Sequence, residues 1–137
     1  MASITGEKRR ILVVDDDATQ LDFVKAILHR EYDVVTIASG RDALELISKG
    51  FVPDLVLLDV LMPEMDGFET FEKIRAMDQM RNVPVIFLTS VNSPEEIRKA
   101  LELGAIDYIT KPYVMENFMN RIWNAIQVYE YKKSPAC

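Results

Sequence analysis

The chain has 137 residues, 49% of them hydrophobic, and a formal net charge of −6, which suits one domain with a proper core and leaves too few residues for two. No apolar run approaches the roughly 20 residues that span a bilayer, and the first residues lack the apolar segment of a signal peptide, so we expect a cytoplasmic protein without membrane contact. The acidic balance argues against direct nucleic-acid binding, which needs a basic surface. The single cysteine, Cys137, excludes an internal disulfide, and the single histidine, His29, argues against histidine-based catalysis.

Five short apolar runs predict buried strands. They are continuous rather than alternating, as expected for a parallel sheet that is covered on both faces. In chain order they are ILVV (11–14), VVTIA (34–38), LVLL (55–58), VIFL (85–88) and YIT (108–110). Helical patterns lie between them, so we expect an α/β fold, doubly wound, with a five-stranded parallel sheet and helices on both faces.

The predicted helices have apolar stripes and recognisable ends. The stripes comprise Leu21, Val24 and Leu28 in the first helix, Ile97, Ala100 and Leu101 in the fourth, and Phe118, Ile122, Ala125, Ile126 and Tyr129 in the last. Ser93-Pro94-Glu95-Glu96 predicts a capping box, with Ser93 as N-cap and Glu96 reaching back to it. Gly50 and Gly104 suit helix C-termini. We expect a loose tail over residues 1–9, one domain over residues 10–131, and a second tail or cut linker over residues 132–137.

Polar side chains follow four of the predicted strands. In open α/β sheets, ligands bind at the carboxyl ends of the strands, which meet at one edge. The first strand is followed by three aspartates, the third by one, and the fourth and fifth by a hydroxyl and an ammonium; these are Asp15, Asp16 and Asp17, then Asp59, Thr89 and Lys111. Each has an ordinary structural explanation alone, and for Asp17 we favour a helix N-cap with Gln20 as its partner. Their joint placement predicts a site.

Charge indicates the chemistry of this site. Neighbouring carboxylates repel one another unless a cation lies among them, and Mg²⁺ prefers such oxygen ligands. A carboxylate can also attack phosphorus and form an acyl phosphate, a transfer that depends mainly on positioning and on neutralising the transferred oxygens. Mg²⁺, Lys111 and the Thr89 hydroxyl could supply that neutralisation.

With these residues and motifs, the sequence resembles the receiver domains of two-component response regulators. The resemblance runs from about Arg10 to Tyr131 and rests on VVDDD, DLVLLDVLMPEMDGFE, FLTS and GAIDYITKP, which occur in the expected order and spacing. It implies a flavodoxin-like sheet with strand order 2-1-3-4-5. It also implies a signalling switch that catalyses only its own phosphorylation and dephosphorylation.

The resemblance assigns a role to each polar residue. Asp15 and Asp16 would hold Mg²⁺ together with Asp59, the phosphoacceptor, and the backbone carbonyl of Leu61. Thr89 would close on the phosphoryl group, Lys111 would pair with its oxygens, and Tyr108 would turn inward when Thr89 moves. The bond between Lys111 and Pro112 should be cis. Leu61 and Val91 are apolar and would lie beside the phosphoryl group, where they could shield it from water.

The resemblance further implies a phosphoryl donor and a responding surface. The donor would be a sensor histidine kinase or a histidine phosphotransfer protein. The surface would be the face formed by the fourth helix, the fifth strand and the fifth helix, through which a homodimer is one option; it would carry Arg98, Lys99, Asp107, Tyr113, Met119 and Trp123. The chain is either a free-standing receiver or part of a longer regulator.

Three alternatives remain open from the residues. In a haloacid-dehalogenase-like phosphatase, Asp15-x-Asp17 would supply the nucleophile, Asp15, and Asp59 would have no role. A flavodoxin-like cofactor binder would need a phosphate-cradling loop after the first strand, where this chain is acidic. A pseudo-receiver would bind partners without being phosphorylated, and the intact set of acids in this chain argues against it.

Overall fold

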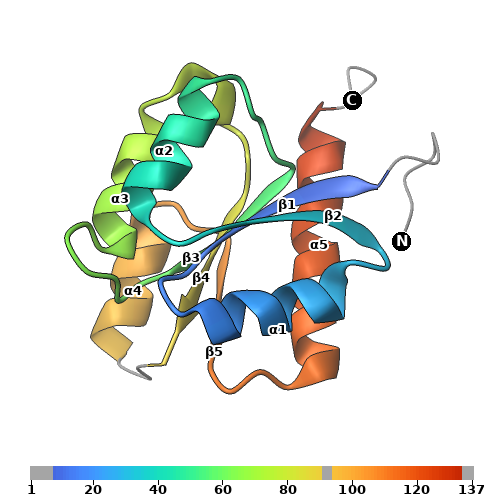
Figure 1. The fold of residues 1–137 in the computed structure, drawn as a ribbon. Helices are drawn as coiled ribbons and strands as arrows, with labels where there is room; N and C mark the ends of the chain where they lie inside the picture. The colour runs from blue at the N-terminus through green and yellow to red at the C-terminus, as the bar shows by residue number, and fades with distance from the viewer. Residues whose placement is uncertain (1–7, 91–93, 134–137) are drawn as a thin grey trace.

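The computed structural model describes residues 8–90 and 94–133, which form one five-stranded parallel sheet between two layers of helices (Figure 1). The strands are β1 (Arg9–Val14), β2 (Tyr32–Ile37), β3 (Leu55–Asp59), β4 (Val85–Thr89) and β5 (Asp107–Thr110). Their order in the sheet is β2-β1-β3-β4-β5. This confirms the predicted fold class and strand order, with strand ends that differ from the prediction by one or two residues.

In the described residues, four helices and a short 3₁₀ turn connect the strands, and a fifth helix follows β5. They are α1 (Ala18–Leu28), α2 (Gly40–Ser48), α3 (Gly67–Arg75), η1 (Asp78–Met80), α4 (Pro94–Glu102) and α5 (Met115–Lys133). Gly50 and Gly104 have the positive φ expected of helix C-termini. No helix in the described ranges is long and apolar enough to cross a membrane.

Alternate residues of each strand face opposite layers of helices. Leu12 and Val14 of β1 pack in the cluster with α2, α3 and α4, whereas Ile11 and Val13 pack in the cluster with α1 and α5. The strand side chains are therefore apolar on both faces, which explains the continuous apolar runs. The predicted stripes of α1 and α5 are buried.

The prediction for α4 was wrong at one position. Ala100 is buried, but Leu101 is 46% exposed and lines a surface groove instead of joining the core. The apolar stripe of α4 is thus narrower than its sequence suggested, because part of it faces the outside of the molecule.

Candidate functional site

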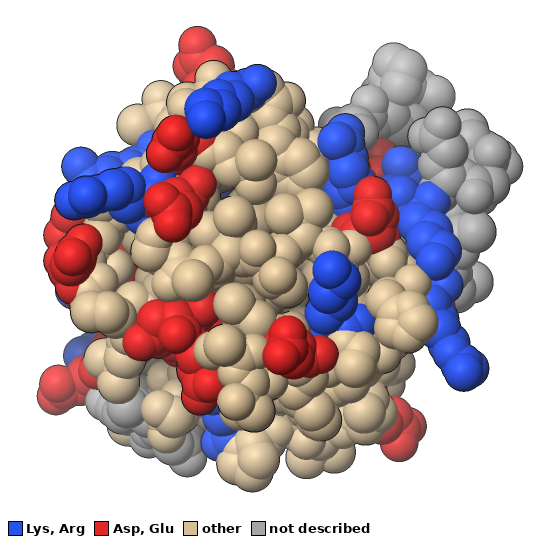
Figure 2. Space-filling model, in the orientation of Figure 1, with Lys and Arg blue, Asp and Glu red and all other residues tan. Residues whose placement is uncertain are grey.

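The parallel direction of the strands brings the predicted polar residues to one edge of the sheet. Asp15 follows β1, Asp59 ends β3, Thr89 ends β4 and Lys111 follows β5. In Figure 2, acidic side chains gather over the region where Figure 1 places the junction of β1 and α1, and basic side chains gather beside the start of β1.

Asp15 is almost fully buried, with 1% of its surface exposed, and both of its carboxylate oxygens accept hydrogen bonds. Oδ1 accepts from the backbone N–H of Asp17 at 3.0 Å, and Oδ2 accepts from Nζ of Lys111 at 3.0 Å. The side chain is thus fixed by the loop that it begins and by the lysine across the sheet.

Asp59 is also buried but is held less tightly. Its Oδ1 lies 3.5 Å from Nζ of Lys111, and its Oδ2 accepts no hydrogen bond from a side chain or N–H of the described residues. Burial, together with the charge of Asp15, raises the pKa of Asp59 to about 6, and Lys111 opposes this rise only in part. At neutral pH the side chain is mostly an anion with one oxygen available for a new bond.

The loop after Asp59 is held in place by a close approach of α3. The backbone N–H of Gly67 donates to the carbonyl oxygen of Val60 at 2.8 Å. A Cβ at position 67 would collide with the backbone of Asp59 and Val60. Only glycine permits this packing, so α3 fixes the backbone that carries Asp59.

Lys111 carries the positive charge that lies between the two buried acids. Burial alone would lower the pKa of Lys111, but its hydrogen bond to Asp15 and the charge of Asp59 raise it above the ordinary value. Its backbone N–H donates to the carbonyl oxygen of Thr89 at 2.8 Å, which ties the β5 end of the site to β4. The peptide bond between Lys111 and Pro112 is cis, as predicted.

Three carboxylates at this edge could share a cation. One oxygen each from Asp15, Asp16 and Asp59 lie within 4.8 Å of one another. The single ammonium of Lys111 cannot balance three ionised carboxylates, so the cluster keeps an excess of negative charge. Asp16 is exposed and can reach a hydrated ion. Mg²⁺ prefers carboxylate oxygens and retains several waters, so this donor set fits the ion.

Other predicted residues have more varied outcomes. Asp17 is the N-cap of α1, and its side chain accepts from the N–H of Thr19 at 2.9 Å, which confirms the predicted cap. The N–H of Asp17 donates to Asp15 rather than to its predicted partner, Gln20, so that part of the prediction was wrong. Leu61 is 55% exposed, and its carbonyl as a metal ligand stays a prediction. Val91 and Ser93 lie outside the described residues.

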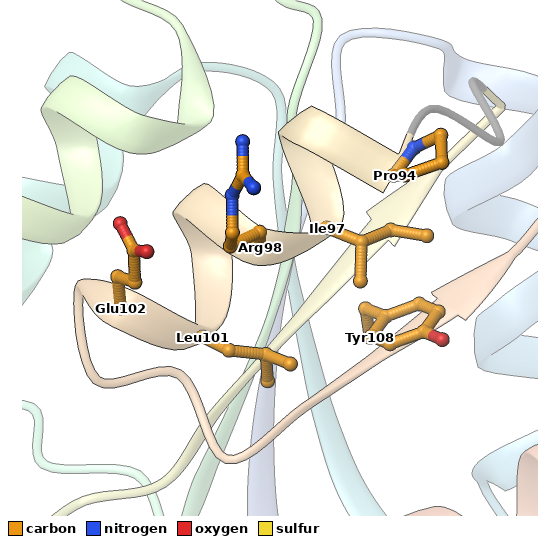
Figure 3. A pocket seen from close by; sticks show the side chains of 6 residues that line it. All are labelled: Pro94, Ile97, Arg98, Leu101, Glu102 and Tyr108. Carbon is orange, nitrogen blue, oxygen red and sulfur yellow. The ribbon is translucent and has the colours of Figure 1, made fainter.

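Thr89 and Tyr108 lie together beside α4. Thr89 is 3% exposed, and Tyr108 is partly buried, with the guanidinium of Arg121 5.9 Å from the centre of its ring. Tyr108 also lines an outer groove of about 540 Å³ with Pro94, Ile97, Arg98, Leu101 and Glu102 (Figure 3). Arg98 and Lys99 are exposed, Trp123 is 39% exposed, and Asp107 forms an ion pair with Arg121.

Tyr113 does not lie where the sequence analysis placed it. Its ring stacks on Phe118, with ring centres 4.7 Å apart, and on Phe23 of α1 at 6.4 Å. It packs against the cluster of α1 and α5, whereas the place of Met119 on the predicted face stays a prediction. The correction arises because the chain turns after Pro112 toward α1. The buried Tyr113 hydroxyl has no partner among the described residues, and burial with the charges of Asp15 and Asp59 raises its pKa.

Comparison with known proteins now defines the class. Residues 11–123 match the response regulator receiver domain family, so the chain belongs to the receiver domains of two-component response regulators, a family of signalling switches.

Individual relatives agree with this membership. The chain is 33% identical over 117 residues to two-component response regulator ORR3 of Oryza sativa subsp. indica, covering 85% of this chain and 88% of that one. It is 39% identical to transcriptional regulatory protein ZraR of Escherichia coli strain K12, covering 90% of this chain and 27% of that one. The receiver domain of sensor histidine kinase PA1611 from Pseudomonas aeruginosa PAO1, solved with magnesium coordinated in its active site cleft, has a TM-score of 0.78 and 29% identity, covering 88% of this chain and 98% of that one.

The relatives differ in total length. The chain spans nearly all of ORR3, but only 26%, 9% and 27% of three other curated relatives. Receivers of this kind therefore occur both in short proteins and within much longer ones.

Proposed function

We propose that this chain accepts a phosphoryl group on Asp59 and, in response, changes its affinity for a partner. The observation that carries the proposal is the position of Asp59 at the mouth of β3. One of its oxygens lies beside the Lys111 ammonium at 3.5 Å, and two further carboxylates lie within 4.8 Å. A buried nucleophile, a fixed cation and a set of metal ligands are thus gathered at one edge of the sheet.

The residues divide the work of phosphoryl transfer. A carboxylate oxygen of Asp59 forms a bond to phosphorus while the bond between phosphorus and the donor's leaving group breaks. Lys111 neutralises an oxygen of the transferred group, and the Thr89 hydroxyl donates to another. Mg²⁺ bound to Asp15, Asp16, Asp59 and the Leu61 carbonyl would supply further positive charge for an anionic donor.

Asp59 suits the nucleophile better than Asp15 does. Both oxygens of Asp15 are already engaged, by the Asp17 N–H and by Lys111, whereas Asp59 keeps one oxygen without such a partner. This favours the receiver over the phosphatase alternative, in which Asp15 would attack.

The phosphoryl donor in this proposal is a histidine kinase or a histidine phosphotransfer protein. The responding surface is the face made by α4, β5 and α5, where Tyr108 and the groove are placed. A small two-state rearrangement there would change the affinity for a partner or for a second copy of the chain. Equal partner affinity with and without beryllofluoride, a phosphoryl mimic, would remove this part of the proposal.

Intact-mass measurement after incubation with acetyl phosphate and Mg²⁺ tests the nucleophile. We expect one added phosphoryl group in the parent, none in Asp59→Asn, and normal labelling in Asp22→Asn, which alters an exposed aspartate on α1. Label that persists in Asp59→Asn but is lost in Asp15→Asn, with turnover of small phosphate esters, would support the phosphatase instead.

A further inference from the structure

A small cavity borders Tyr108, which also lines the outer groove. Its volume is about 10 Å³, which is at the limit for one water molecule. Thr89, Glu96 and Tyr108 line it together with the apolar side chains of Val60, Phe87, Ile97 and Ala100. Polar residues from β4, α4 and β5 therefore line one small space.

Glu96 brings an unusual atom to this cavity. Its Oε2 is buried and accepts no hydrogen bond from the described residues. A buried acceptor without a donor is destabilising, and such atoms are rare in folded proteins. The neighbouring Glu95 occupies the same first turn of α4 but is exposed. Because the unpaired Oε2 of Glu96 is destabilising, a donor that reached this atom in another conformation of the protein would stabilise that conformation.

Thr89 and Tyr108 are the hydroxyl-bearing residues that line the cavity with Glu96, and Tyr108 has the longer side chain. Tyr108, together with Ile97, lines both the small cavity and the outer groove, so its side chain borders both spaces. Figure 3 shows the ring beneath Ile97, with its hydroxyl pointing away from Arg98 and Glu102. A rotation of the ring toward the cavity would move the hydroxyl into the space that Glu96 borders.

We propose that Glu96 is a positioning residue, which holds Tyr108 in an inward position by accepting a hydrogen bond from its hydroxyl at Oε2. The cavity is too small for the end of the ring while Thr89 keeps its place. The inference therefore rests on the proposed function, because Thr89 must move toward a phosphoryl group on Asp59 before the ring can enter. Glu96 thus links the phosphorylation site to the groove beside α4.

A capping role for Glu96 makes a different prediction. A capping box stabilises α4 in the free and activated protein alike, so its loss would lower stability without regard to Tyr108. A hydrogen bond formed only by the inward ring couples the two residues in the activated protein alone. A double-mutant cycle separates these roles.

The experiment measures the affinity of the full chain for beryllofluoride in the presence of Mg²⁺. The variants are Glu96→Met, which removes the acceptor at similar length, Tyr108→Phe, which removes the donor, and their combination. We expect each single change to weaken binding about threefold to tenfold, a range typical of coupled neighbours, and the double change to weaken it no further. Glu96→Gln, which retains an acceptor oxygen, and Glu95→Gln, on the exposed side, should bind like the parent.

Fluorine NMR of protein labelled with 3-fluorotyrosine reports the surroundings of the Tyr108 ring. If Glu96 had only a structural role in α4, its loss would not change how this signal responds to beryllofluoride. The Tyr108 signal, assigned by its loss in Tyr108→Phe, should shift with beryllofluoride in the parent and shift less in Glu96→Met. Glu96→Ala serves as the second variant if Glu96→Met does not fold.

Additive effects, or an unchanged Tyr108 shift in both Glu96 variants, would overturn the assignment to Glu96 while leaving the proposed function intact. A parent that does not bind beryllofluoride, or binds it equally in Asp59→Asn, would overturn the proposed function and this inference with it.

Discussion

Two buried polar regions lie on either side of Thr89, and they are built in opposite ways. At the sheet edge, Asp15 has a partner for each oxygen, and Lys111 lies between the two buried acids. Beside Tyr108, Glu96 keeps a buried oxygen that has no partner in the described part of the chain, next to a cavity. The first region has an excess of negative charge around a lysine that pairs with both buried acids, whereas the second has a buried oxygen without a partner among the described residues and a little unused space.

This difference indicates what each region should respond to. An excess of negative charge in a fixed geometry responds to an added cation or to the loss of a charge. An unpaired acceptor beside a cavity responds to a change of shape that brings a donor. Thr89 lines the cavity, and its carbonyl oxygen accepts from the Lys111 N–H, so it connects the two.

The largest effect should follow removal of the cation from the charged region. Lys111→Met deletes the ammonium and leaves Asp15 and Asp59 buried without it. Breaking a buried ion pair on one side typically costs about 3–5 kcal/mol, so the free energy of unfolding in urea without metal should fall by that amount. The control is Lys25→Met, which changes an exposed lysine of α1. A loss below about 1 kcal/mol would show that Lys111 does not compensate the acids.

Removal of the Asp59 charge should raise the free energy of unfolding instead of lowering it. The pKa of Asp59 rises from 3.8 to about 6 on folding. Between these values the folded protein holds a proton that the unfolded chain has released, so the stability that Asp59 contributes falls as pH rises through this window. Asp59→Asn removes this penalty. It should match the parent near about pH 4 and exceed it above about pH 6, by at most roughly 3 kcal/mol.

The measurement is urea unfolding of parent and variant across this pH range in the presence of EDTA. Asp54→Asn would be a poor control because Asp54 accepts from the Arg10 N–H, so Asp22→Asn is preferred. A stability difference that is constant with pH would contradict the raised pKa of Asp59.

An added cation should relieve the same repulsion. An ion that binds only the folded cluster stabilises it by about 2.7 kcal/mol at ~100 times its dissociation constant. We expect Mg²⁺ to raise the melting temperature of the parent, and beryllofluoride with Mg²⁺ to raise it further. Asp16→Asn should melt no lower than the parent without metal and lose most of the Mg²⁺ response. An equal response in both proteins would place the metal elsewhere.

The charged region could be predicted from the sequence because its residues follow strands. Continuous apolar runs indicated parallel strands, and parallel strands bring Asp15, Asp59 and Lys111 to one edge whatever the details of packing. The strand order and the cis bond before Pro112 came from the family resemblance alone. Both were confirmed, but periodicity could not have supplied them.

The second region could not be predicted because it depends on where side chains point. The sequence pattern predicted a capping role for Glu96, and nothing local indicated that one of its oxygens would be buried in the cavity that Thr89 and Tyr108 also line. Tyr113 was misplaced for the same reason, since the turn after Pro112 decides which face its ring joins. Leu101 follows a buried helix position yet lies in the groove. Such outcomes depend on the tertiary packing of α1 and α4.

The smallest change in stability should follow substitution of Leu101, on the groove beside Tyr108. Leu101 is 46% exposed and lines the groove beside Tyr108, so Leu101→Ser creates no internal void and should change the free energy of unfolding by less than about 0.5 kcal/mol. The same substitution at Leu28, which is fully buried on α1, should cost several kcal/mol, since it leaves a cavity and buries a hydroxyl. Because Leu101 lies outside the sheet edge, Leu101→Ser should also accept one phosphoryl group from acetyl phosphate as the parent does. Urea unfolding and intact mass check both statements. A large loss of stability would mean that Leu101 belongs to the core and that the groove is not a free surface of the protein.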